Sequence, residues 1–284
     1  MANIPARVET RIKEALKRFQ PVVEQAKARD IGEADTSTLV KDILAELFGY
    51  DKYAEVTAEF QIKGTYCDLA LKIDGKLALL IEVKAINSEL KETQIKQAVD
   101  YAANQGLEWV ILTNAQTWQI YKVVFAQPIS NELLMTLPFS TLSAKNDNDL
   151  QSLFLLTREA QGKSLLDEYH QQKQALSRFC VGAVVLSDPV VSVIRRELKR
   201  LSPDVRIDAD EICTVLRDEV IKREVLEGDR ATEAKRKVNK AANKALRARI
   251  DSEPSTNSSP PTAAAWATPV SANVSPAVGA EVIS

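Results

Sequence analysis

The sequence predicts an α/β fold in which a mixed sheet, flanked by helices, is followed by a helical region and a disordered tail. In the first half, segments with helical apolar spacing alternate with shorter apolar segments typical of strands. From about residue 150 to 250 only helical spacing recurs, and from residue 251 onward Ser, Pro, Ala and Thr dominate without periodicity. We therefore expect four parts: an N-terminal helical segment 1–29, a sheet domain 30–145, a helical region 146–250 and a disordered tail 251–284.

Three helices are expected in the first two parts. The first covers residues 5–29, and Pro21 should kink it or start a second helix. The next follows the N-cap residues Asp35, Thr36 and Ser37 and stops at Gly49. The third begins at Ser88, ends near Asn104 and places Gln94, Gln97 and Tyr101 on one face.

Strand-like segments occupy the intervals between these helices. They cover residues 54–62, the two halves of 66–84, residues 106–114 and residues 117–125. The resulting order is helix, strand, strand, strand, helix, strand, strand. This order predicts a mixed sheet with helices packed against it.

The central hairpin reads YCDLALKIDGKLALLIEVK over residues 66–84. Glu82 and Lys84 are two residues apart, so their side chains project from the same face of the strand. Leu77, Leu79, Ile81 and Val83 alternate with them and should face a core. The carboxylate and the ammonium are therefore adjacent, either as an ordinary surface pair or as part of a reactive site.

The register of this hairpin decides whether Asp68 joins them. A two-residue turn at Asp74 and Gly75 would pair residue i with 149 − i and place Asp68 on the opposite face. A three-residue loop at 73–75, with Gly75 left-handed, pairs i with 148 − i. Asp68 then lies opposite Leu80, diagonal to Glu82. Only the second register places three apolar residues of the first strand with those of the second, so we predict it: they are Cys67, Leu69 and Leu71.

With that register the hairpin has the elements of a metal-assisted hydrolase. The Asp68 and Glu82 carboxylates are hard oxygen ligands, which favour Mg²⁺ or Mn²⁺ over zinc. Lys84 is placed to orient a water molecule or to stabilise negative charge on a phosphate. Such a site suits phosphodiester hydrolysis.

The rest of the composition excludes several other classes. Three separated cysteines and one histidine argue against zinc fingers, Ser-His-Asp triads and Cys-His pairs. The histidine, His170, lies in the polar helical run EYHQQKQ and should be exposed. The sequence contains neither an apolar run of membrane-spanning length nor a secretory signal at its start, so we expect a cytoplasmic protein without membrane contact.

A basic helix is expected over residues 230–249. The whole chain carries a net charge of −2, yet this segment has eight basic residues against Glu233 alone. Such a helix either neutralises nucleic-acid phosphates without reading sequence or packs as a solvated helix on another surface. The residues proposed to bind nucleic acid are Lys235, Arg236, Lys237, Lys240, Lys244 and Arg247.

The motif residues also resemble a known group of enzymes. Asp68 followed by IEVKA at 81–85 resembles the PD-(D/E)XK nuclease signature, and QAVDY at 97–101 resembles the Gln-x-x-x-Tyr element of its RecB-like branch. Together with GEADTSTLVKDILAELFGYD and WVILTNAQTWQIY, they resemble the N-terminal nuclease domain of type I restriction enzyme R subunits in a stand-alone form. The resemblance covers roughly residues 30–140.

This resemblance implies a restriction-endonuclease-like fold and a Mg²⁺-dependent (or Mn²⁺-dependent) DNA endonuclease connected with restriction or defence. It assigns catalytic roles to Asp68, Glu82 and Lys84, with the metal held by the two carboxylates. Gln97 and Tyr101 would lie beside the site. An acidic residue on the early helix often completes the family's site, and here Glu33 is the first choice and Glu46 the second. The chain departs from the family in having Cys67, not proline, before Asp68.

Two further expectations concern partners and energy supply. Gly162, Lys163 and Ser164 resemble the end of a phosphate-binding loop, but Thr157 stands where its first glycine belongs. Any ATP-driven translocation should therefore come from another polypeptide. DNA is the expected partner, other restriction or defence subunits are candidate partners, and a homodimer is left open. The alternative function is a nucleic-acid- or partner-binding module that keeps the nuclease fold with little or no activity.

Overall fold

The computed structural model describes residues 3–62 and 65–252, with side chains described except in 59–66 and 245–252. The chain divides into two compact units, Met1–Val181 and Gly182–Ser284. We call them unit 1 and unit 2. The chain has the mixed α/β class that the sequence predicts: unit 1 contains the sheet and its flanking helices, and the described part of unit 2 is helical.

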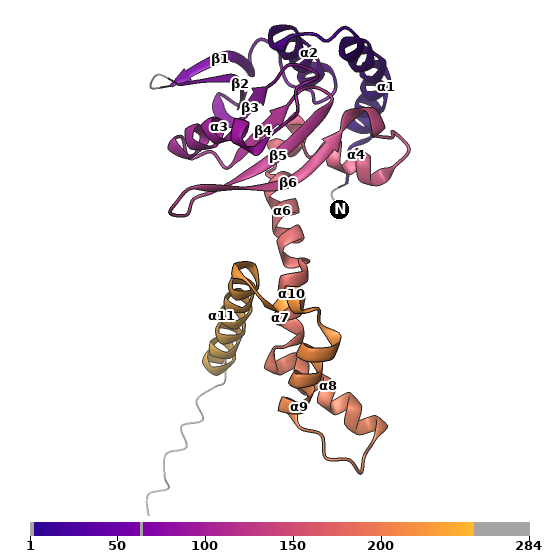
Figure 1. The fold of residues 1–284 in the computed structure, drawn as a ribbon, viewed down its shortest axis with the longest axis vertical. Coiled ribbons are helices and arrows are strands. Elements are labelled where there is room, and N and C mark those ends of the chain that lie inside the picture. Colours follow the sequence, from indigo (N-terminus) through magenta and orange to yellow (C-terminus); the bar gives the residue numbers. More distant parts are fainter. Residues whose placement is uncertain (1–2, 63–64, 253–284) are drawn as a thin grey trace, which may run out of the picture. The chain divides into compact units, whose positions relative to one another are not determined.

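Unit 1 is built on a six-stranded sheet with the order β1-β2-β3-β4-β5-β6 (Figure 1). Strands β3 and β4 run parallel and all other neighbours run antiparallel, so the sheet is mixed, as predicted. The last strand was not predicted. The strands are β1 (Val56–Ile62), β2 (Thr65–Ile73), β3 (Lys76–Val83), β4 (Trp109–Thr113), β5 (Thr117–Val124) and β6 (Ser130–Pro138).

Helices cover both faces of this sheet (Figure 1). On one face, α1 (Ala6–Ala28) and α2 (Glu33–Glu46) bury side chains such as Phe19 and Ile43 against the sheet residues Leu69 and Ile81. On the other face, α3 (Glu92–Asn104) packs against a second core that includes Leu80 and Leu112. The central strands are therefore buried on both sides, and polar groups on them are confined to the strand ends.

The helix boundaries differ from the predicted ones in three places. Helix α1 continues through Pro21, which is exposed while the flanking Phe19 and Val23 hold both halves of the helix in the core. Helix α2 begins at Glu33, so the predicted caps lie within its first turns. Helix α3 begins at Glu92, because Ser88 belongs to the preceding loop.

Unit 1 extends beyond residue 145, where the sheet domain was expected to end. The chain continues through α4 (Asp147–Phe154), α5 (Arg158–Gln161) and α6 (Leu165–Ala175). Leu153 and Phe154 of α4 and Leu166 of α6 are buried in the same core as α1 and α2. These helices therefore complete the covering of the sheet.

His170 on α6 is not exposed, so that prediction was wrong. Only 12% of its side-chain surface is accessible, and its Nε2 lies 3.3 Å from Oε2 of Glu132. Its ring packs edge-on against Trp109, with ring centres 5.8 Å apart. Helix α6 has the polar composition of a surface helix, but the strands β4 and β6 cover this side of it.

The β2–β3 register also differs from the prediction. Asp74 and Gly75 form a two-residue turn, both with positive φ, so the predicted three-residue loop is wrong. Lys72 pairs with Leu77, but Leu71 pairs with Leu79, so Ala78 is an extra, bulged residue. The bulge shifts the pairing to i with 150 − i, which preserves the predicted face of Leu69 and Leu71. The flanking Cys67 and Leu77 instead pack on the α3 side.

Unit 2 is helical over its described residues. Helix α7 (Arg178–Val185) spans the boundary, followed by α8 (Asp188–Leu201), α9 (Ala209–Val215), a π-helical turn (Leu216–Val220), α10 (Arg223–Leu226) and α11 (Asp229–Ser252). The predicted disordered tail lies outside the described residues, apart from residues 251 and 252 at the end of α11. No helix in the described ranges combines the length and apolar character needed to cross a membrane.

Candidate active site

Asp68 within β2 and Glu82 near the end of β3 are brought together on neighbouring strands. Continuing the bulged register places Asp68 beside Glu82, one step closer than the predicted diagonal. Oδ2 of Asp68 accepts a hydrogen bond of 2.7 Å from the backbone N–H of Val83. This bond ties the Asp68 side chain to the strand that carries Glu82, so the bulge at Ala78 decides the geometry of the site.

Lys84 forms an ion pair within this cluster. Its Nζ donates to Oε1 of Glu82 at 2.7 Å and lies 3.8 Å from Oε2 of Glu33. The side chains of Glu82 and Lys84 are 16% and 19% exposed, so the pair is largely shielded from water. Glu33 lies in the first turn of α2 and is half exposed. The Lys84 ammonium therefore pairs with the carboxylates of Glu82 and Glu33 and lies within the electrostatic influence of Asp68.

The electrostatics of the cluster favour a protonated lysine. Burial raises the pKa of Glu82, the hydrogen bond from Lys84 opposes that shift, and the negative charges of Asp68 and Glu33 add to it. Burial alone would lower the pKa of Lys84, but the hydrogen bond to Glu82 and the nearby carboxylates raise it above its usual value. Lys84 is thus a cation at neutral pH and a hydrogen-bond donor, not a proton acceptor.

The loop after Lys84 is held from two sides. On one side, Ile86 N–H bonds to the carbonyl of Ile31 at 3.3 Å, and the Asn87 side-chain amide donates to Asp30 at 2.8 Å. These contacts join the loop to the α1–α2 connection, two residues before Glu33. The position of Glu33 beside Lys84 is thereby linked to the sheet.

On the other side, the turn between β4 and β5 supports the same loop. The Gln116 side-chain amide donates to the Ile86 carbonyl at 2.6 Å, and that of Asn114 donates to the Ser88 carbonyl at 2.9 Å. Lys84 N–H bonds to Thr113 O at 2.8 Å. Asn87, Asn114 and Gln116 were not identified in the sequence, because their contacts cross 26 to 57 positions and leave no local spacing signal.

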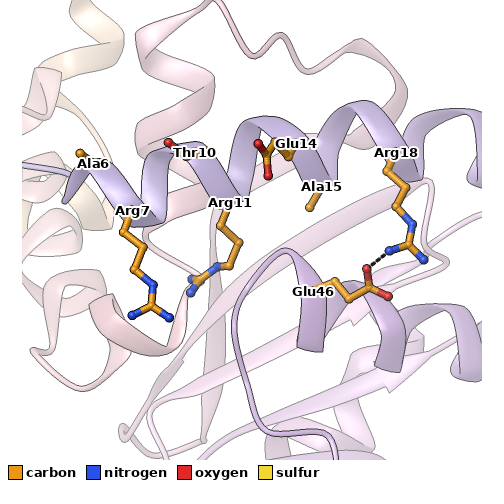
Figure 2. Close-up of a pocket in the computed structure, with 8 residues that line it drawn as sticks. All are labelled: Ala6, Arg7, Thr10, Arg11, Glu14, Ala15, Arg18 and Glu46. Carbon is orange, nitrogen blue, oxygen red and sulfur yellow. Dashed lines mark hydrogen bonds and ion pairs between the residues drawn. The ribbon is translucent and has the colours of Figure 1, made fainter.

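Glu46, the second choice for an additional acid, lies away from the cluster. It is 13 residues after Glu33 on α2, which is about 20 Å along the helix axis. Figure 2 shows that it turns towards Arg18 of α1, with which it forms an ion pair. Glu46 lines a groove beside α1 that also contains Arg7 and Arg11. Of the two predicted acids, only Glu33 reaches Lys84.

The two α3 residues have different environments. Gln97 is exposed, whereas Tyr101 is buried in the α3-side core, with 5% of its surface accessible. The Tyr101 hydroxyl has no hydrogen-bond partner within the part of the chain that the structure describes. Burial raises the pKa of Tyr101, and the nearby Cys67 adds to this shift. Tyr101 thus packs with Cys67 of β2, the neighbour of Asp68, in the core on the α3 side of the sheet.

Cys67 occupies the position where the family has proline. It is buried, and its thiol lies 3.4 Å from the carbonyl oxygens of Leu69 and Ile81. Burial raises the pKa of the Cys67 thiol to about 12, and the charge of Glu82 adds to this shift. Cys67 is therefore a packing residue and a protonated thiol, with no nucleophilic character at neutral pH.

The carboxylates fit an ion that takes part of its coordination from substrate. Among the described residues, no three His, Cys, Asp or Glu side chains converge closely enough to form a protein-only metal site. Mg²⁺ usually keeps several waters and binds one or two carboxylates together with substrate phosphates. Asp68 and Glu82 are the two carboxylates that would hold such an ion, and a divalent cation there would relieve the repulsion between them.

A separate basic surface lies on α11 in unit 2. Its residues recur every three or four positions and form one face with a shallow groove: Thr232, Lys235, Arg236, Asn239, Lys240, Asn243 and Lys244. Lys237 lies off this groove and pairs with Glu233 at 2.9 Å. The side chain of Arg247 lies outside the described residues. Four of the six predicted basic residues therefore share one face.

Comparison with known proteins agrees with the resemblance noted in the sequence. Residues 39–138 match the family described as type I restriction enzyme R protein N terminus. The matched segment contains the second half of α2, the six described strands, α3 and the residues Asp68, Glu82 and Lys84, whereas Glu33 lies before it. No curated protein and no solved structure matches the chain. The match suggests a restriction-type nuclease family for this part of unit 1.

Proposed function

We propose that this chain is a Mg²⁺-dependent deoxyribonuclease, an endonuclease of the restriction or defence type that hydrolyses phosphodiester bonds in DNA. The observation that carries the proposal is the convergence of Asp68, Glu82 and Lys84 at one end of the β2–β3 hairpin. The match of residues 39–138 to the type I restriction enzyme R protein N terminus supports the substrate class.

The roles of the side chains follow from their charges. Asp68 and Glu82 would hold Mg²⁺ or Mn²⁺. When bound there, the ion lowers the pKa of an attacking water and neutralises charge on the scissile phosphate. Lys84 remains protonated because three carboxylates surround it, so it donates a hydrogen bond to the water or to a phosphate oxygen. Glu33 holds the Lys84 ammonium from the α2 side.

Cleavage of plasmid and single-stranded DNA in Mg²⁺ or Mn²⁺ tests this proposal. Asp68→Ala should abolish cleavage, and Lys84→Ala should slow it by about 10²- to 10³-fold, as expected for loss of one electrostatic donor. Glu46→Gln is the matched control, because Glu46 lies on the same helix as Glu33 but contacts Arg18. Wild-type protein that binds no metal and cuts nothing, or variants that cut equally well, would show that the catalytic assignment is wrong.

The alternative is a DNA-binding module that keeps the nuclease fold without activity. The groove on α11 favours a binding role in either case, because Lys235, Lys240 and Lys244 have no acidic partner in the described residues. Phosphate contacts by such side chains bring DNA to the protein without reading its sequence. DNA binding without any metal-dependent cleavage would favour this alternative over the nuclease.

A further inference from the structure

The turn between β4 and β5, residues 114–116, lies at the same edge of the sheet as Lys84. Strands β3 and β4 run parallel, with Val83 paired to Thr113, so both strands end at this edge. Lys84 directly follows β3, and its backbone N–H bonds to the Thr113 carbonyl at 2.8 Å. The loop that leaves Lys84 and the turn that leaves β4 are therefore neighbours.

This turn is closed by side chains around a buried residue with an unfavourable backbone. Ala115 is 0% exposed and has a φ of 64°, a left-handed conformation that costs free energy for a residue with a Cβ. Oγ1 of Thr113 accepts a hydrogen bond of 3.0 Å from the Ala115 N–H, and Nε1 of Trp118 donates to the Ala115 carbonyl at 3.2 Å. Oδ1 of Asn114 accepts from the Thr117 N–H at 2.8 Å. These contacts hold the turn in one conformation.

Two side-chain amides of the turn reach out of it to the loop after Lys84. Asn114 closes the turn with its oxygen, and its nitrogen donates to the Ser88 carbonyl at 2.9 Å. Nε2 of Gln116 donates to the Ile86 carbonyl at 2.6 Å. The two carbonyls belong to one short loop, so these bonds fix the path of the chain as it leaves Lys84.

Gln116 also connects this loop to the α2 side of the site. Its Nε2 lies 3.3 Å from Oδ1 of Asn87, whose amide donates to Asp30 at 2.8 Å. Asp30 lies in the α1–α2 connection shortly before Glu33, whose carboxylate lies 3.8 Å from the Lys84 ammonium. The contacts of Gln116 therefore continue to the segment that brings Glu33 to Lys84.

We propose that Gln116 is a positioning residue: it holds the loop after Lys84 and thereby fixes the place of the Lys84 ammonium in the site. A lysine ammonium stands on a flexible four-carbon stem, so it keeps one position only where its backbone and its partners are held. Asn114 supports the same loop from the same turn. This inference rests on the proposed function, in which Lys84 donates to the attacking water or to a phosphate oxygen, and Gln116 acts only through Lys84.

Steady-state cleavage kinetics of the full chain test the role of Gln116. Gln116→Met removes the amide donor at nearly constant side-chain length. It should lower kcat about tenfold with KM for DNA unchanged, because a displaced donor weakens only the transition state. Adding Gln116→Met to Lys84→Ala should cost less than about twofold, since Lys84 is then absent. An unchanged kcat, or a full tenfold loss in the Lys84→Ala background, would overturn the proposal.

Gln161→Met is the matched control. The Gln161 amide likewise donates to a loop carbonyl, that of Leu155 at 2.8 Å. Gln161 lies on α5, whose Arg158 contacts Asp74 at the opposite end of the β2–β3 hairpin. This variant should leave kcat unchanged. A loss of kcat equal to that of Gln116→Met would show a general effect of losing stability and would contradict the positioning role.

The mobility of the Lys84 side chain provides a second measurement that does not need cleavage. In the metal-free protein, NMR order parameters of the Lys84 Cε–H bonds, assigned by comparison with Lys84→Ala, should be lower in Gln116→Met than in wild type and Gln161→Met. Equal order parameters would overturn the proposal even if wild type cuts DNA. If wild type cuts nothing but the order parameters differ as expected, the proposed function is wrong while Gln116 still positions Lys84.

Discussion

Glu82 is the residue whose protonation should set the acid limit of cleavage. A carboxyl must be ionised to bind a metal, and burial together with Asp68 and Glu33 raises the pKa of Glu82. As the pH is lowered, cleavage should therefore begin to decline at a pH above the ordinary glutamate pKa of about 4.3. Glu33→Gln removes one repelling charge and should move this decline to lower pH. Rate–pH profiles of wild type, Glu33→Gln and the control Glu46→Gln measure it, and superimposable profiles would contradict the electrostatic coupling.

The raised pKa of Glu82 also determines how the stability of the folded protein changes with pH. Because the pKa of Glu82 is higher in the folded state, its contribution to stability is present below the ordinary glutamate pKa and is lost as pH rises through the folded value. At neutral pH the ionised Glu82 thus opposes folding. Glu82→Gln should raise the unfolding temperature at neutral pH, with a smaller effect in acid, and should abolish cleavage. An unfolding temperature that falls at neutral pH would show that the Lys84 ion pair outweighs the burial of Glu82.

The buried hydroxyl of Tyr101 can be tested separately for a role in stability and a role in cleavage. A buried hydroxyl without a partner costs about 1–3 kcal/mol, so Tyr101→Phe should leave stability unchanged or raise it by about 1 kcal/mol. Tyr121→Phe is the control, because the Tyr121 hydroxyl donates to Gln119 at 2.9 Å and its loss should lower stability. Denaturant unfolding measures both. If the Tyr101→Phe protein is stable but cleaves more slowly, the hydroxyl takes part in cleavage. A large loss of stability would instead show that the hydroxyl makes a hydrogen bond that stabilises the folded protein.

At the scale of elements, α11 gives a quantitative prediction about DNA binding. Each phosphate contact that is lost should reduce the slope of log affinity against log salt concentration by about 0.9 for duplex DNA. Replacing Lys235, Lys240 and Lys244 with alanine should therefore flatten the slope, while the single change Lys237→Ala should alter it less, since Lys237 already pairs with Glu233. Fluorescence anisotropy at several salt concentrations measures the slopes. Equal slopes for wild type and the triple variant would remove α11 from the DNA-binding surface.

At the scale of the whole molecule, the two units should differ in stability. Unit 1 has a sheet covered on both faces, whereas unit 2 buries few apolar side chains in its described residues. Amide hydrogens of α8 and α9 should therefore exchange faster than those of β3 and β4. Hydrogen-exchange mass spectrometry measures this difference, and equal protection of α8, α9, β3 and β4 would contradict the prediction.

Local patterns in the sequence predicted most of the elements of the sheet domain and placed Glu82 and Lys84 on one face of a strand. The mixed sheet with flanking helices follows from apolar spacing, and the proximity of Glu82 and Lys84 follows from the alternation of side chains along one strand. The match of residues 39–138 confirms the family resemblance that the quoted motifs indicate. The catalytic and metal-binding roles of Asp68, Glu82 and Lys84 remain predictions.

Tertiary structure decided the features that depend on an inserted residue or on distant contacts. The bulged Ala78 changes the hairpin register, and an extra residue at Leu134 interrupts the alternation along β6, which explains why that strand was missed. Similarly, Glu33 reaches Lys84 because Asn87 ties the loop after β3 to Asp30 in the α1–α2 connection, whereas Glu46 lies further along α2 and pairs with Arg18. The alternation of side chains along a strand is visible in neighbouring residues of the sequence. A bulge that interrupts this alternation is stabilised by contacts with the partner strand and by packing across the sheet, which the local sequence does not reveal.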